Sequence, residues 1–81
     1  MKSIHDPRYV SMIKRLKRLR KERNVSQVML AERLQWKQQD ISRVESFVRR
    51  LDIIELYDWL KALEIKVEDF LEEVEQGWPK E

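Results

Sequence analysis

The stretch SQVMLAERLQWKQQDISRVE, residues 26–45, contains two short amphipathic segments separated by three residues. Ser26 is a good N-cap for the first segment, residues 27–34, because its hydroxyl can accept a hydrogen bond from an amide of the first helical turn. The second segment covers roughly residues 38–46, with its apolar residues at helical spacing. Two short helices joined by such a turn predict a helix-turn-helix, and the small Ala31 lets the two helices cross closely.

A longer helix is expected before this pair. Apolar residues recur at spacings of three and four over residues 9–23, which predicts one amphipathic face. Asn24 tolerates the left-handed backbone that ends many helices. Pro7 is expected to break any helix upstream of it, so residues 1–8 are predicted to form an N-terminal arm.

Two more helices are expected after the pair. Asp52 followed by Glu55 has the spacing of a capping box, which predicts a helix over residues 53–63. A further helix is expected over residues 67–75. The last residues, 76–81, are predicted to form a flexible tail.

The composition fits one small domain, expected over residues 9–75. The chain has 81 residues, and 42% of them are apolar, which is enough for a single core. There is no cysteine and only one histidine, His5, so no metal site, cofactor or catalytic triad is expected, and we do not expect an enzyme. No run of apolar residues is long enough to cross a membrane, and the N-terminus lacks the apolar core of a signal peptide. We therefore expect a cytoplasmic protein. We also expect no small-molecule ligand, because a chain of 81 residues leaves no room for a separate ligand-binding domain.

The charge is divided between the two ends of the chain. Residues 1–50 hold 14 Lys and Arg against 5 Asp and Glu, whereas residues 51–81 hold 3 against 10. The net charge of +2 hides this asymmetry. It suggests that the first part faces a polyanion and that the acidic part faces solvent or a partner, although many charges also simply keep a small helical protein soluble.

The motifs resemble the Cro/phage-repressor-like (XRE-type) helix-turn-helix family. The resemblance rests on LKRLRKERNVSQVMLAERL, on QQDISRVE and on RRLDIIELYDWLKALEI, and it covers about residues 13–71. It implies an all-α fold, a compact five-helix lambda-repressor-like domain. It also implies binding to double-stranded DNA, usually as a two-fold dimer.

The resemblance assigns roles to individual residues. Positions that usually reach base edges fall on Gln38, Gln39 and Arg43, with Ser42 on the same outward face. A position that usually holds a phosphate falls on Gln27. A buried ion pair that ties the first helix to the third falls on Arg20 and Glu45.

Side-chain chemistry supports the base-reading role. A glutamine amide matches the donor and acceptor of adenine in the major groove, and an arginine matches the two acceptors of guanine. We therefore expect Gln38 and Gln39 to read bases while the neighbouring cations bind phosphates. Two alternatives stay open: the glutamines are ordinary solvated residues, or Arg43 forms an intrahelical ion pair with Asp40.

Cations close in sequence to residues 38–46, the expected recognition helix, are candidate phosphate contacts. These are Lys37, Arg49 and Arg50; their alternative role is surface solubility.

The chain departs from the family where glycine is usual. Gln35, Phe47 and Glu64 stand at those positions, and a left-handed backbone there costs about 1 kcal/mol or more without glycine. Trp36 is expected either under the turn or beside the sugar-phosphate chain.

We expect a homodimer that blocks or recruits polymerase at a pseudo-palindromic operator. Candidate dimer contacts are Tyr57, Leu60, Leu71 and Val74, and their alternative place is the core of one chain. Trp59 is expected in the core or at the interface. An alternative function is that of an antitoxin, whose acidic last helices bind a toxin while DNA binding is secondary.

Overall fold

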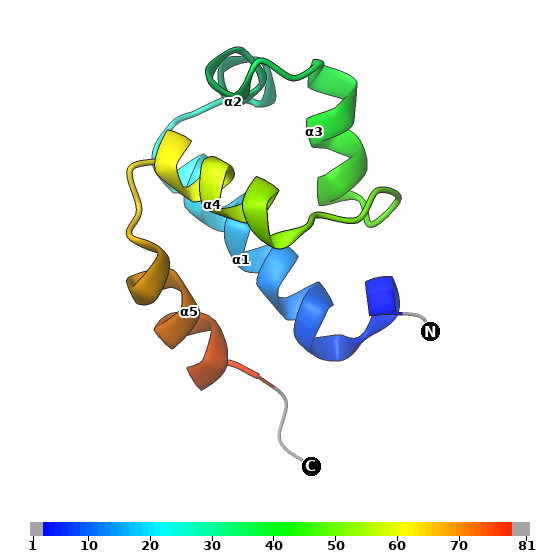
Figure 1. The fold of residues 1–81 in the computed structure, drawn as a ribbon, viewed down its shortest axis with the longest axis vertical. Helices are drawn as coiled ribbons and strands as arrows, with labels where there is room; N and C mark the ends of the chain where they lie inside the picture. Colours follow the sequence, from blue (N-terminus) through cyan, green and yellow to red (C-terminus); the bar gives the residue numbers. More distant parts are fainter. Residues whose placement is uncertain (1–2, 79–81) are drawn as a thin grey trace.

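Five α-helices and one short 3-10 turn make up the part of the chain that this computed structural model describes, residues 3–78 (Figure 1). In chain order they are η1 (Ser3–His5), α1 (Pro7–Glu22), α2 (Gln27–Leu34), α3 (Gln38–Glu45), α4 (Ile53–Ala62) and α5 (Val67–Gln76). Helices α1 and α4 run through the middle of the molecule, with α2 and α3 towards one end and α5 towards the other (Figure 1). The expected all-α, five-helix fold is confirmed.

Helix α1 begins earlier than expected, at Pro7 instead of residue 9. Asp6 caps it, accepting a hydrogen bond of 2.8 Å from the amide of Arg8. Proline suits the first helical position, because the missing N–H has no intrahelical partner there and φ is already helical. Pro7 therefore starts the helix, and much of the expected arm is ordered structure, while residues 1–2 lie outside the described residues.

The other helices lie close to their expected bounds. Ser26 caps α2 through the amide of Met29 at 3.0 Å, and Asp52 and Glu55 form the expected capping box of α4. Helices α3 and α4 each end one residue early and α5 one residue late. In the expected tail, Trp78 packs against the core, and residues 79–81 lie outside the described part of the chain.

The core draws on all five α-helices. Its largest buried side chains are Trp59, Phe70, Ile13, Leu16, Leu30, Ile41, Leu60, Leu63 and Val44. Trp59 thus takes the first of its two expected places. Leu60 and Val74 are 0% and 3% exposed, so the expectation that they contact a dimer partner is wrong. They fill the interior because the inner face of each helix carries its most apolar residues.

Within residues 3–78, four residues other than glycine have a left-handed backbone. Asn24, Gln35, Phe47 and Glu64 have φ between 57° and 66°. The last three are the positions where the family usually has glycine. The ring of Phe47 packs against the core, and that burial offsets part of the backbone strain.

Candidate nucleic-acid interface

Helix α3 presents a polar face on a rigid base. Ile41 and Val44 are 0% exposed and hold the helix against its neighbours. Gln38, Gln39 and Arg43 are exposed on the other side, whereas Ser42 is half-buried. The structure therefore brings three of the four expected base-reading residues to one accessible surface.

A chain of hydrogen bonds connects this face to the interior. The buried guanidinium of Arg20 donates to both carboxylate oxygens of Glu45, at 2.7 and 2.9 Å, and to the carbonyl of Val25 at 2.8 Å. The Glu45 carboxylate also accepts from the Gln27 amide at 2.9 Å, and the Gln27 carbonyl oxygen accepts from the Gln38 amide at 2.7 Å. The expected Arg20–Glu45 ion pair is thus present, and it orients two side chains outside the core.

These hydrogen bonds limit the contacts that the Gln27 side chain can make with DNA. Its side chain, expected on a phosphate, is held by Glu45 and Gln38. Its backbone amide, at the first position of α2, has no intrahelical partner and remains available to an anion. The amide of Gln38 keeps its carbonyl oxygen and one N–H unpaired within residues 3–78, which is the donor–acceptor set that adenine requires.

The cations around α3 differ in their surroundings. Within the described residues no ion pair joins Arg43 to Asp40, so Arg43 can reach outward. Lys37 is exposed at the N-cap of α3. Arg50 is exposed and lies 5.9 Å from the ring centroid of Tyr9.

Arg49 is placed differently from the other candidate phosphate contacts. Its guanidinium carbon lies 4.5 Å from the ring centroid of Trp36, and its Nη2 donates to Glu55 at 3.0 Å. Trp36 meets the buried Trp59 edge to face, with centroids 5.9 Å apart. Trp36 thus packs under the turn, which was one of its two expected places. The sequence showed Glu55 only as part of the capping box, so this contact with Arg49 was missed.

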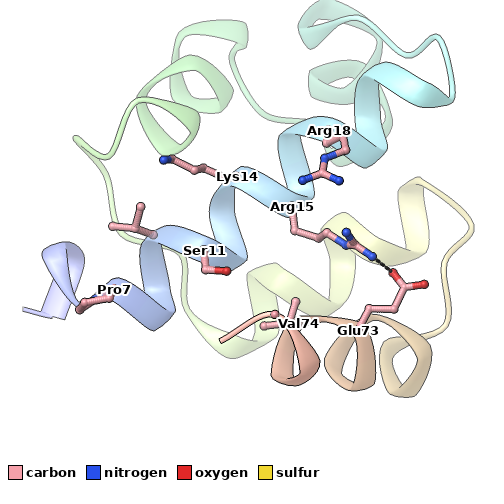
Figure 2. A pocket seen from close by; sticks show the side chains of 9 residues that line it. Pro7, Ser11, Lys14, Arg15, Arg18, Glu73 and Val74 are labelled. Carbon is pink, nitrogen blue, oxygen red and sulfur yellow. Dashed lines mark hydrogen bonds and ion pairs between the residues drawn. The ribbon is translucent and has the colours of Figure 1, made fainter. Parts of the chain in front are cut away.

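A second basic region lies between α1 and α5, away from α3 (Figures 1 and 2). It is a hollow of about 420 Å³ whose charged lining residues are Lys14, Arg15, Arg18 and Glu73. Arg15 and Glu73 form an ion pair of 2.7 Å across it (Figure 2). Part of the basic run on α1 therefore serves the contact between α1 and α5.

Two other features are absent from the described part of the chain. Among residues 3–78 no three His, Asp or Glu side chains are grouped closely enough to hold a metal ion. None of the described helices is long and apolar enough to cross a bilayer.

Comparisons with known proteins agree with this geometry. A family model described as helix-turn-helix matches residues 16–70. An XRE-family-like protein from Pseudomonas syringae pv. tomato str. DC3000 superposes with a TM-score of 0.85 at 32% identity, over 94% of this chain and 93% of that one. A point mutant of the restriction–modification controller protein C.Esp1396I superposes with a TM-score of 0.75 at 29% identity, over 94% and 92% of the two chains. A search of curated proteins found no significant match.

Proposed function

Because this chain belongs to the XRE-type helix-turn-helix family, whose members are DNA-binding transcription regulators and not enzymes, we propose that it represses transcription from a pseudo-palindromic operator. The observation that carries the proposal is the exposed polar face of α3, held on a buried apolar base and oriented by a hydrogen-bonded chain. A rigid helix with such a face matches the edges of paired bases in the major groove.

Gln38, Gln39 and Arg43 read the bases in this proposal. Each bidentate contact discriminates against the wrong base by about 1–3 kcal/mol. Ser42 is half-buried, so its contribution is limited to the rim of the contact. The fixed rotamer of Gln38 lowers the entropy lost on binding, because its side chain is already ordered by Gln27.

Phosphate contacts set the register of the helix on the duplex. The candidate phosphate contacts are the exposed Lys37 at the N-cap of α3, the exposed Arg50 in the loop after α3, and the first amides of α2. Cations that replace condensed counterions make the affinity fall as salt rises. A regulator of this kind therefore binds any DNA weakly and its operator tightly.

The two half-sites require two copies of the chain. A two-fold dimer would place its α3 helices about 34 Å apart, one turn of the duplex. Exposed apolar residues on α4 suit such a contact: Ile53 and Ile54 are each 66% exposed and Tyr57 is 51% exposed. Tyr57 also lines a hollow with Val67, one turn before the exposed Leu71 on α5. Tyr57 and Leu71 therefore remain the candidate dimer contacts.

Selection from random duplexes tests the proposal. Purified full-length protein is mixed with duplexes of random sequence, and its mass in solution is measured in parallel. We expect an enriched motif with two inverted halves about ten base pairs apart and a mass of two chains. Enrichment of no motif would refute base reading, and a monomer that selects a single half-site would refute the dimer.

The acidic surface of α5 supports a second candidate, an antitoxin. Leu71 is exposed there among carboxylates. These carboxylates belong to Glu68, Asp69, Glu72, Glu73 and Glu75. A basic protein that co-purifies in stoichiometric amount, and that is lost on replacing Leu71 with Glu, would favour this function.

A further inference from the structure

Two adjacent arginines follow the recognition helix, and the structure treats them differently. The Arg50 side chain is exposed. The Arg49 side chain is 34% exposed, with its guanidinium against the face of Trp36 and its Nη2 on the carboxylate of Glu55. The Nη1 atom of Arg49 is buried. The stack on Trp36 and the ion pair with Glu55 hold the Arg49 guanidinium in place, so a phosphate would have to compete with these contacts.

The partners of Arg49 are themselves fixed. Trp36 precedes α3 by two residues and packs edge to face on Trp59, which is 0% exposed. The second carboxylate oxygen of Glu55 accepts from the amide of Asp52 in the capping box of α4. Arg49 therefore lies between two anchored groups, one before α3 and one at the start of α4.

The backbone of the loop is also tied to α3. The amides of Val48 and Arg49 both donate to the carbonyl of Arg43, at 2.9 and 3.0 Å. The position of the Arg49 side chain is thus coupled to the last turn of α3. Trp36, which lies two residues before α3, is coupled to its first turn.

We propose that Trp36, Arg49 and Glu55 form a positioning clamp that fixes both ends of α3 on α4, so that Arg49 supports base reading without contacting DNA. The clamp rests on the proposed function, because positioning matters only if α3 reads bases. A helix displaced by about 1 Å loses aligned contacts with base edges, whereas contacts between cations and phosphates tolerate such shifts. Loss of the clamp should therefore lower affinity for the operator more than affinity for random DNA.

The test compares Arg49→Gln with Arg50→Gln on the selected duplex and on a random duplex over a range of salt concentrations. We expect Arg50→Gln to weaken binding to both duplexes alike and to reduce the slope of log K against log salt by about one. Arg49→Gln should weaken binding to the selected duplex about tenfold, with the slope and the random-duplex affinity unchanged. If Arg49→Gln behaves like Arg50→Gln, Arg49 is a phosphate contact and the clamp is wrong.

Conservative variants sharpen the distinction. Lysine can bind a phosphate, but it lacks the planar guanidinium with which arginine stacks on a ring while it donates to a carboxylate. Arg49→Lys should therefore match Arg49→Gln, and Trp36→Ala should match both, while Trp36→Phe should recover part of the affinity. If Arg49→Lys binds the selected duplex as tightly as wild-type protein does, the clamp is wrong.

Hydrogen exchange without DNA separates this inference from the proposed function. In Arg49→Lys and Trp36→Ala the amides of α3 should lose protection about tenfold while those of α5 keep theirs. Unchanged protection of α3 would refute the clamp even if the wild-type protein selects an operator. Failure of the wild-type protein to select any duplex would refute base reading, and the exchange result would still decide whether the clamp exists.

Discussion

At the scale of single residues, one buried ion pair links stability to recognition. The side chains of Arg20 and Glu45 are 7% and 2% exposed, and the pair is bidentate. Glu45 has a further bond to Gln27, which in turn holds Gln38 on the outer face of α3. A buried charge needs such a set of partners, because its desolvation is costly when a partner is missing. The same carboxylate thus stabilises the core and, through Gln27, orients the Gln38 amide that we propose reads a base.

Replacing Glu45 with alanine should lower the free energy of unfolding by about 3–5 kcal/mol, because Arg20 would be left as an unpaired buried charge. Urea denaturation measures the change. The matched control is Glu73→Ala, which removes the half-exposed partner of Arg15 (Figure 2) and should cost less than about 1 kcal/mol. Equal losses in the two variants would contradict the structural role given to Glu45.

At the scale of elements, the ends of the helices carry strain as well as caps. Side-chain caps at Asp6, Ser26 and Asp52 start three of the helices. Gln35, Phe47 and Glu64 follow the C-terminal ends of α2, α3 and α4 with φ near 60°, where a Cβ atom is unfavourable. The chain makes these left-handed turns without glycine, the residue that adopts them most easily.

Glu64→Gly should raise the free energy of unfolding by about 0.5–1 kcal/mol, since Glu64 is exposed and the change relieves only the backbone. Thermal denaturation followed by circular dichroism measures it. Phe47→Gly should instead destabilise the protein by more than about 1 kcal/mol, because the packing of the ring against the core is lost. Stabilisation by both changes would show that the ring contributes little.

The local signals of the sequence predicted the elements well. The caps at Ser26 and Asp52 and the helical spacing of apolar residues depend only on neighbours within a few positions. The start of α1 was placed two residues too late, because Pro7, which ends any helix before it, also suits the first position of the helix that follows. Such signals place elements along the chain but do not show which side of a helix its neighbours cover.

Tertiary packing explains what the sequence did not predict. Leu60 and Val74 lie in the core because α4 packs on α2 and α5, and α5 packs on α1 and α4; the spacing of apolar residues does not tell such a core from a dimer interface. The stack of Arg49 on Trp36 joins residues thirteen positions apart, on either side of α3. Among the candidate site residues, the exposed ones on α3 could be predicted from one amphipathic helix, whereas the role of Arg49 required the whole fold.

At the scale of the whole molecule, the two charge groups lie on different elements. The proposed base-reading face is on α3, and most carboxylates of the second half of the chain belong to α4 and α5. Helix α5 lies away from α3 (Figure 1). A DNA duplex bound by α3 would lie away from α5, and repulsion between its phosphates and the carboxylates would keep α5 outward.

If the protein is the proposed dimer, Tyr57→Glu should convert it into a monomer, because the change places a charge in the apolar contact proposed on α4. Sedimentation equilibrium measures the mass, and binding to an operator with one half-site destroyed serves as the control. The variant should bind the complete operator no more tightly than wild-type protein binds the half-site. A dimer of unchanged stability would show that Tyr57 is not part of the interface.

The most direct test of the account is the base discrimination of a protein with both Gln38 and Gln39 replaced by alanine. Both side chains are exposed, so the free energy of unfolding should stay within about 0.5 kcal/mol of wild type. Binding is measured by fluorescence anisotropy on the selected duplex and on duplexes with one base pair exchanged at each position. We predict that base-pair exchanges at the positions that the two amides read will no longer change the affinity of the variant, so that it binds those duplexes nearly as tightly as the selected one. A variant that folds, binds as tightly as wild type and keeps the same base preference would contradict it.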